Sequence, residues 1–555
     1  MGLVTGRAAS YRSLFLERRA ELTHLARRTW EVVLLAAVVG ILTGGAVSAL
    51  DTVILGIEEK AVELPLWLVA GLPAVGLVLA ALLLRYIGGG ISPSTADEYL
   101  RAFHDSRHPL PGRPFVARTM ASIATLGLGG PMGLEGPSIY AGTTIGSWIR
   151  NLTGRLQSAR DRRVLLAAGA AAGVAAIFKA PATGAIFALE VPYQDDFARH
   201  LLLPSLVGAA TGYLTFAAFE GTEPLFLVSE GVPFNYPDLV AAIGLGILAA
   251  LGARFFARGL RWAKKRSETT SPWARVLVAG ALLAAFVVIS DWATGQPLSF
   301  GPGYAAIQWA LDPSRALWAV AVLLAVRCLG TVTVVGGGGV GGLFVPLVVG
   351  GALTGRLVGG MVHAVDESLF TVVGVAAFLG AGYRVPLAAV MFVAETTGQP
   401  GFVVPGLLAA VAAELVMGTS SVTAYQMAPQ RTPSPADKKS AADASDAKAG
   451  PDDEAPPSGA APGPGGGDRP PEGDAGSQRG GGATPRRPER RGLVGEPGAP
   501  AQTGAPPPGR PDPRPSRRPD PPPGGPGEGG GGGHTGTVSA SASPPPEPSP
   551  DPPER

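Results

Sequence analysis

Residues 127–142 read GLGGPMGLEGPSIYAG, an apolar stretch that glycine and proline interrupt at several points. The stretch places one carboxylate, Glu135, at the interruption, and it contains no side chain of opposite charge. A bilayer tolerates irregular backbone only where protein buries it or where it lines a cavity. The stretch therefore predicts a broken helix at a pore or a binding site.

The surrounding sequence is typical of a polytopic membrane protein. Of the 555 residues 46% are hydrophobic, and apolar runs recur at or near the roughly 20 residues that cross a bilayer core. These runs are residues 30–50, 66–84, 201–219, 239–257, 274–289 and 317–335. A soluble domain would not contain so many, so we predict an all-α membrane domain over residues 30–428.

The two flanking segments differ from this domain in composition. Residues 1–29 spread their arginines over an amphipathic segment, so we expect a basic helix at the cytoplasmic surface and not a secretory signal. Basic clusters at residues 150–163 and 254–266 are expected on the same side of the membrane. Residues 429–555 contain almost no apolar side chain larger than alanine, which predicts a disordered cytoplasmic tail rich in Pro, Gly and Arg.

Internal repetition divides the membrane domain into two halves. GLEGPSIYAGTTIG, residues 133–146, aligns without a gap on GLFVPLVVGGALTG, residues 342–355. FKAPATGAIFALE, residues 178–190, aligns on YRVPLAAVMFVAE, residues 383–395. Both pairs lie at nearly the same spacing, so they belong to one duplication. We place the two repeats at about residues 30–220 and 238–428.

Duplicated halves with interrupted hydrophobic segments indicate a transport site at the repeat interface. Pro137 and Pro346 suit the first turn of a helix, where unpaired N–H groups carry the positive end of the helix dipole. Two such ends facing each other would bind an anion weakly enough to release it. Glu135 could occupy the same field, blocking the path when ionised and clearing it when protonated or displaced. The alternative is a glutamate that only caps its helix; we favour the gating role, because an intramembrane carboxylate is a functional candidate by default.

Three motifs in the same order resemble those of the CLC family of chloride channels and chloride/proton antiporters, in its prokaryotic form. GLEGP resembles the family's G-(K/R)-E-G-P, GGLFVP resembles G-x-F-x-P, and GGGIS, residues 88–92, resembles a degraded G-S-G-I-P. The likeness covers about residues 15–428, without the nucleotide-sensing CBS domains that some members carry. It implies a CLC-like inverted-repeat fold with broken and re-entrant helices. It also implies a homodimer with one anion pathway per subunit, integral to a bacterial plasma membrane, with both termini in the cytoplasm.

The resemblance also implies roles for particular residues. Glu135 would be the gating glutamate. The anion-binding candidates are Gly89, Gly90, Ile91, Gly133, Gly136, Leu343, Phe344, Thr423 and Tyr425. Thr423 and Tyr425 are alternatives for the residue that lines the inner mouth, because the register of SSVTAYQM against the family's pore-lining tyrosine is open.

Four departures from the family pattern bear on function. Gly89 replaces the serine whose hydroxyl contacts the central anion, Ser92 replaces a proline, and Leu134 replaces a basic residue. Val191 stands where proton-coupled members carry a second, inner glutamate. Since valine cannot carry a proton, we predict passive chloride conduction. The alternative is chloride/proton exchange through a water wire or another inner acid. Glu190, beside Val191, is expected to stabilise the structure.

Other function classes find little support in the sequence. It contains no H-E-x-x-H or G-x-S-x-G motif, and its six histidines show no paired metal-ligand spacing. We therefore expect neither an enzyme, nor a metal, nor a cofactor, and we expect no nucleic acid partner. The partners expected are chloride or other small anions and the lipid bilayer. Arg327 either reaches towards the interface or adds positive potential beside the path.

Overall fold

The structure is a computed structural model that describes residues 2–153, 158–194, 196–226, 228, 235–362 and 367–427. The tail predicted at residues 429–555 lies outside them. The described part is helical, with 16 α-helices, two short 3-10 helices and no strand. The first half contains α1 (Gly2–Val62), α2 (Leu66–Tyr86), α3 (Ala96–His104), α4 (Gly112–Gly127), α5 (Glu135–Thr153), α6 (Ala159–Phe178), α7 (Pro181–Glu190) and α8 (Leu202–Glu220). The second half contains α9 (Tyr236–Thr269), α10 (Pro272–Thr294), α11 (Tyr304–Ala310), α12 (Leu317–Gly337), α13 (Phe344–Met361), α14 (Glu367–Tyr383), α15 (Pro386–Thr397) and α16 (Val403–Met417).

Eight helical segments in the described residues are long and apolar enough to cross a membrane. They are Trp30–Val62, Leu66–Tyr86, Arg199–Glu220, Tyr236–Thr269, Pro272–Thr294, Leu317–Gly337, Phe344–Met361 and Pro400–Met417. The prediction of an all-α polytopic membrane protein is confirmed, and the six apolar runs lie in six of these segments. The segments Phe344–Met361 and Pro400–Met417 are not among the predicted apolar runs. The first has the lowest hydropathy of the eight, 1.4, because this largely buried helix packs through glycines.

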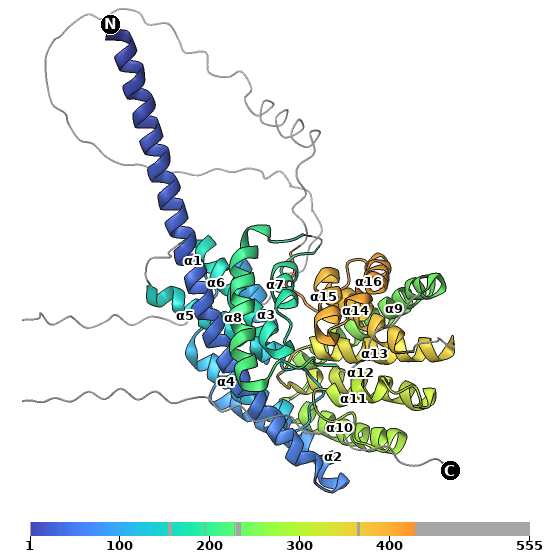
Figure 1. Cartoon of the computed structure of the whole chain (residues 1–555). Coiled ribbons are helices and arrows are strands. Elements are labelled where there is room, and N and C mark those ends of the chain that lie inside the picture. Colours follow the sequence, from blue (N-terminus) through green and yellow to red (C-terminus); the bar gives the residue numbers. More distant parts are fainter. Residues whose placement is uncertain are drawn as a thin grey trace, which may run out of the picture. The chain divides into compact units, whose positions relative to one another are not determined.

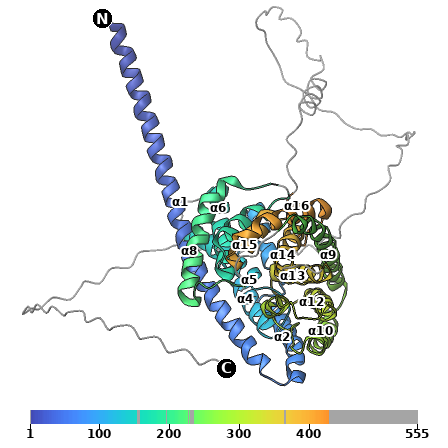
Figure 2. The ribbon, with the colours of Figure 1, turned by 45° about the vertical axis from the view of Figure 1, so that its right-hand side comes forward.

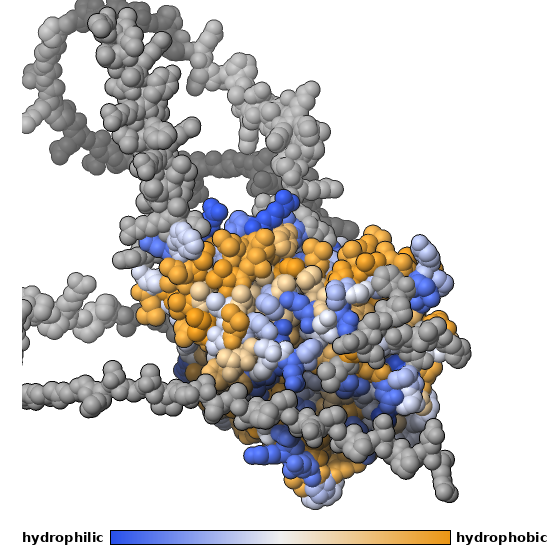
Figure 3. Space-filling view, viewed as in Figure 1, coloured by the Kyte–Doolittle hydropathy of each residue, from blue (hydrophilic) through white to orange (hydrophobic). Residues whose placement is uncertain are grey.

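The outer surface of the bundle agrees with a bilayer setting. Figure 3 shows apolar side chains over much of the visible face. Large apolar side chains are exposed on several of the long helices, among them Leu34, Phe255 and Leu277. The predicted boundary near residue 30 is not a break, because α1 is continuous from Gly2 to Val62. A cytoplasmic surface position for residues 1–29 stays a prediction.

The two halves have the same helix packing. α5 packs on α6 as α13 packs on α14, and α1 packs on α8 as α9 packs on α16. The pair α2 and α4 has its counterpart in α10 and α12, and a 3-10 turn precedes the last helix of each half. Figures 1 and 2 show the second half, from α9 to α16, beside the first.

The halves meet at their matching motifs. The N–H of Gly133 donates to the carbonyl of Gly342 at 2.9 Å, and the N–H of Gly342 donates to the carbonyl of Gly133 at 2.7 Å. The two glycines are mates in the repeat alignment, and they form an antiparallel bridge. In an inverted repeat, a pseudo-two-fold axis in the membrane plane relates the two halves, so matching segments that meet at the axis run antiparallel. The axis therefore passes between Gly133 and Gly342.

Two carboxylates join the halves reciprocally. Glu395 of α15 accepts hydrogen bonds from the amides of Ala182 and Thr183 at the start of α7, at 2.8 and 2.7 Å. Glu190 of α7 accepts hydrogen bonds from two amides at the start of α15, at 3.2 and 3.0 Å. Each carboxylate accepts from N–H groups at the start of the matching helix in the other half. That helix leaves these groups unpaired, and they lie at the positive end of its dipole. The stabilising role expected of Glu190 agrees with this geometry.

Close helix contacts in each half depend on glycine. A Cβ atom at Gly142 of α5 would overlap the carbonyl of Gly169 in α6. A Cβ atom at Gly351, the repeat mate of Gly142, would lie 2.5 Å from the carbonyl oxygen of Gly374 in α14. Small residues of this kind let helix backbones approach closely in membranes. These contacts fix how α5 and α13 are held, and both helices begin at the candidate site.

Candidate functional site

Two helix N-termini meet beside the Gly133–Gly342 bridge. α5 begins at Glu135 and α13 begins at Phe344. Pro137 and Pro346 lie in the first turns, where the missing N–H of proline costs no hydrogen bond. Both helix dipoles therefore direct positive potential at this place, with no lysine or arginine required.

The Glu135 carboxylate occupies that place. The side chain is fully buried, and its Oε1 accepts a hydrogen bond from the Phe344 amide at 2.5 Å. Its other oxygen, Oε2, has no hydrogen-bond partner among the described residues. A side chain at Gly133 or Gly342 would overlap the carboxylate. The Glu135 carboxylate thus lies at the N-terminus of α13 and accepts from an amide that the helix itself leaves unpaired.

The loop that carries Gly89 and Gly90 lies against the same junction. Both glycines have positive φ angles, +77° and +84°. Ile91 packs in an apolar cluster with Val340, which shortly precedes α13. Leu343 occupies the N-cap position of α13 without a side-chain capping bond, and Gly136 lies against the backbone of residues 341 and 342.

Two residues that the sequence analysis did not identify hold this loop. Thr95 donates through its hydroxyl to the carbonyl of Gly341 at 3.2 Å. Arg118, on α4, donates to the carbonyl of Ser92 at 3.1 Å and to the hydroxyl of Tyr140, on α5, at 2.9 Å. The loop is therefore tied to both helices that begin at the site. The sequence offered no signal for either contact, because the partners lie far apart in the chain.

We predict that Gly89→Ser raises the preference for chloride over nitrate. No atom lies within 4 Å of a Cβ placed at Gly89, so the hydroxyl has room, although the positive φ costs roughly 1–2 kcal/mol. One added hydrogen bond contributes ~1 kcal/mol, which corresponds to roughly a fivefold change in the flux ratio. Anion flux from liposomes measures that ratio. Gly221→Ser is the matched control, since Gly221 has a φ of +76° and the same open surroundings away from the site. An unchanged ratio in Gly89→Ser would show that the loop does not contact the ion.

An aromatic cluster encloses the first residue of α13. The ring of Phe344 stacks on Phe178 with 4.5 Å between centroids, and Phe187, Phe392 and Tyr383 surround it. Phe178 and Tyr383 are mates that end α6 and α14, just before the matched prolines. Their alignment in the repeat was a signal in the sequence, but neither residue was predicted to belong to the site. Phe344 is therefore fully buried within this cluster.

Thr423 and Tyr425 lie in different surroundings. Tyr425 is 36% exposed, and the Arg101 guanidinium lies 4.3 Å from its ring centroid. The amide of Thr423 bonds to the hydroxyl of Ser421 at 3.2 Å, in a segment that also bonds to the backbone at Gly382. That segment adjoins Tyr383 of the aromatic cluster. Arg101 of α3 thus holds Tyr425, while the neighbouring Gln426 donates to the carbonyl of Tyr383 at 2.8 Å.

Arg327 has a structural explanation. The residue is 3% exposed, so its guanidinium lies within the protein and not at the surface. Its guanidinium donates to the carbonyls of Leu298, Gly301 and Pro302. Gly301 in turn donates to the carbonyl of Gly129, ahead of Glu135. Arg327 therefore holds the loop of residues 298–302, which in turn bonds to the interrupted stretch at Gly129.

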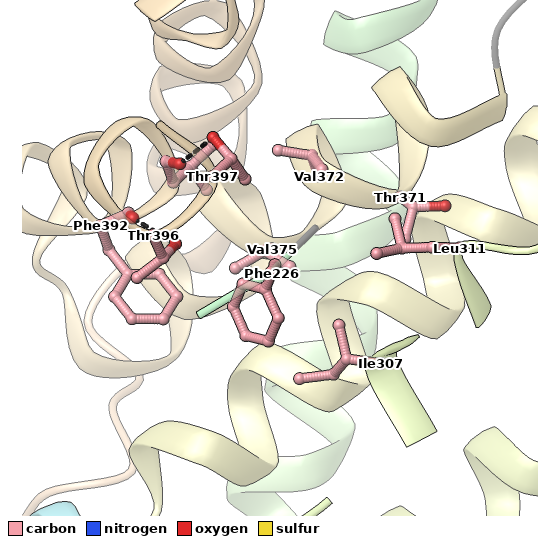
Figure 4. A pocket seen from close by; sticks show the side chains of 10 residues that line it. Phe226, Ile307, Leu311, Thr371, Val372, Val375, Phe392, Thr396 and Thr397 are labelled. Carbon is pink, nitrogen blue, oxygen red and sulfur yellow. Dashed lines mark hydrogen bonds between the residues drawn. The ribbon is translucent and has the colours of Figure 1, made fainter. Parts of the chain in front are cut away.

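A narrow apolar cavity, shown in Figure 4, adjoins the aromatic cluster, because Phe392 lines both. Its volume is about 10 Å³, at the lower limit for one water molecule. The hydroxyls of Thr396 and Thr397 point back to carbonyls of their own helix, at 2.6 and 2.7 Å. The cavity thus offers no free polar group to an ion.

Comparison with known proteins agrees with the motifs. The family described as Voltage gated chloride channel matches residues 74–418, more than half of the chain. A ClcB-like chloride channel protein of Ralstonia nicotianae is 27% identical over 68% of this chain and 89% of its own. The H(+)/Cl(-) exchange transporter ClcA of Cronobacter sakazakii is 26% identical over 74% of this chain and 90% of its own.

Solved structures show the same fold. A slow cyanobacterial Cl-/H+ antiporter aligns with a TM-score of 0.63 at 21% identity, covering 70% of this chain and 94% of that one. A CLC-type fluoride/proton antiporter aligns with a TM-score of 0.62 at 22% identity, covering 72% of this chain and 98% of that one. The match to the family over residues 74–418, together with the meeting of its two helix-start motifs at Glu135, leads to one conclusion: this chain is a member of the CLC family of voltage gated chloride channels.

Proposed function

We propose that the chain conducts chloride and other small anions passively through the membrane, and that Glu135 is the gate. The observation that carries the proposal is the hydrogen bond from the Phe344 amide to the Glu135 carboxylate at 2.5 Å. Anion transport is the activity of the family. The identity of the gate and the passive mode are our inferences from the site.

In the proposed mechanism, an anion and the Glu135 carboxylate compete for the same amides. The ionised carboxylate holds the Phe344 N–H and closes the path. An anion that reaches the start of α13 repels the carboxylate and can replace it, and protonation removes the negative charge that makes the carboxylate a competitor. Backbone dipoles bind the anion without a full positive charge, so it can leave again.

The passive mode rests on Val191. Its side chain is 2% exposed and follows directly on the last residue of α7. An aliphatic side chain cannot accept a proton, and the neighbouring Glu190 already receives two backbone hydrogen bonds from α15. The inner route that a second glutamate supplies in proton-coupled members is therefore missing at this position.

Chloride/proton exchange is the second candidate function, and two observations favour it. Relatives such as ClcA of Cronobacter sakazakii are named exchange transporters. A cavity of about 310 Å³ also adjoins Glu190, with Asp196, Arg384 and Glu414 among its lining residues. Water in this cavity could bring protons to an inner acid without a glutamate at position 191.

Proton-coupled flux in liposomes distinguishes the two modes. The purified chain is reconstituted with a chloride gradient, a potassium ionophore clamps the voltage, and external pH is recorded. We expect chloride to flow with no proton movement against the proton gradient. Uphill proton movement would establish exchange, and Glu190→Gln, which removes the acid beside the cavity, would then show whether that acid carries the protons.

Assembly and orientation are proposed from the family resemblance. We propose a homodimer in a bacterial plasma membrane, with both termini in the cytoplasm and with transport, not catalysis, as the activity. Cross-linking in native membranes measures the dimer. Reporter fusions at each terminus measure the orientation.

A further inference from the structure

An apolar groove lies on the outside of the first half, between α1, α2 and α4. Figures 1 and 2 show these three helices, in blue tones, next to one another. The groove has a volume of about 470 Å³. Its lining includes Ile57 of α1, Leu79 and Leu83 of α2, and Met120 and Ile123 of α4. Aliphatic side chains of this kind suit an acyl chain and offer nothing to a polar ligand.

Two arginines lie at one end of the groove. Arg113, at the start of α4, donates through Nε to the carbonyl of Ile87 at 2.5 Å and through a terminal nitrogen to the carbonyl of Tyr86 at 3.3 Å. The Arg85 guanidinium lies 5.9 Å from the ring centroid of Tyr86, which itself lines the groove. Both arginines are exposed, and neither has a carboxylate within ion-pair distance in the described part of the chain. The groove therefore ends in positive charge that no acidic side chain neutralises.

The position of the groove along α2 matches one leaflet. The rise from Leu79 to Tyr86 is about 10 Å at 1.5 Å per residue, and half of a bilayer core is about 15 Å. The α1 span begins at Trp30 and α2 returns across the membrane, so Arg85 and Arg113 lie on the side where the α1 span starts. The arginine-rich residues 1–29 precede that start, and positive residues favour the cytoplasmic side, where anionic lipids concentrate.

We propose that this groove binds an anionic phospholipid, with one acyl chain along α2 and α4 and the phosphate between Arg85 and Arg113. The apolar lining would accept a chain from any lipid. The arginines select the headgroup, because guanidinium groups form charge-assisted hydrogen bonds with phosphate oxygens and a zwitterionic headgroup offsets its own phosphate charge. The lipid headgroup would bind at the end of α2, which leads into the Gly89 loop, beside the start of α4.

Native mass spectrometry of the full chain in mild detergent tests the proposal. Phosphatidylglycerol and phosphatidylcholine with the same acyl chains are added at equal concentrations. We expect wild type to retain phosphatidylglycerol in clear excess. The variant Arg85→Gln/Arg113→Gln should lose that excess by roughly tenfold or more, since each basic residue near an anionic lipid contributes ~1 kcal/mol. Arg258→Gln/Arg266→Gln removes two exposed arginines from α9 and should retain the excess.

A second variant keeps the charges and fills the groove. Ala124 of α4 lines it, so Ala124→Phe should lower the retention of phosphatidylglycerol although both arginines remain. Arg113→Gln also removes hydrogen bonds to the carbonyls of Tyr86 and Ile87, so it could unfold the end of α2. Ala124→Phe leaves those bonds in place and therefore tests the groove by itself. Equal retention of the two lipids by wild type would overturn the anionic preference. Full retention in Ala124→Phe would place the lipid outside the groove and overturn the site.

Discussion

In Glu135→Gln we expect anion flux to persist and to lose its dependence on pH. Glutamine keeps the shape of the side chain but carries no charge, so it holds the Phe344 amide as a neutral acceptor at every pH. A hydrogen bond to a charged group contributes ~1.5–3 kcal/mol against ~1 kcal/mol for a neutral one. Flux at neutral pH should therefore rise by up to about tenfold. Wild-type flux should rise as pH falls, because protonation removes the competing charge.

Chloride efflux from liposomes, between about pH 5 and about pH 8, measures both effects. Glu223→Gln is the matched control, since Glu223 is exposed and lies away from the site. The control should keep the wild-type pH profile. If Glu135→Gln also kept that profile, another group would be the gate, and Glu135 would be only a helix cap.

The second large effect is expected on stability, in Gly142→Ala. The added Cβ would overlap the Gly169 carbonyl at the crossing of α5 and α6. Overpacking of this kind costs roughly 1–3 kcal/mol, and here the obstacle is backbone that cannot rotate away. α5 positions Glu135, so displaced helices would also disturb the gate. Thermal unfolding in detergent and the yield of monodisperse protein measure the loss.

For Gly244→Ala we expect no loss of stability. Gly244 lies inside α9, and no atom lies within 4 Å of a Cβ placed there. Alanine is a better helix former than glycine by ~1 kcal/mol, so this variant should be neutral or slightly more stable. Equal behaviour of the two variants would mean that the α5 and α6 backbones are not packed as closely as the structure places them.

The sequence indicated the main features of the fold through local patterns. Apolar runs located six spans, and the aligned segments around Gly133 and Gly342 located the repeat. The span Phe344–Met361 was not predicted, because its glycines lower its hydropathy and it is largely buried within the protein. Hydropathy reports contact with lipid, so it is weakest for the helices that build the interior of a membrane protein.

Only part of the candidate site could likewise be predicted from the sequence. Glu135 and the two helix starts could be located from sequence, since proline, glycine and a lone intramembrane carboxylate have local meanings. The contacts of Arg118 and Thr95 with the Gly89 loop could not, because they join residues far apart in the chain. The positions of Thr423 and Tyr425 likewise depend on how residues 421–427 pack beside Tyr383.

The reciprocal contacts of Glu190 and Glu395 bear on how the protein is synthesised. When the ribosome has completed the first half, the start of α7 still lacks the carboxylate that caps it, because Glu395 belongs to the second half. Glu190 likewise has no α15 to cap. The newly inserted first half therefore holds unpaired amides and an unpaired acid until the second half docks. During that interval, chaperones or membrane quality-control proteases that detect polar groups within the bilayer would be able to bind or cleave the first half.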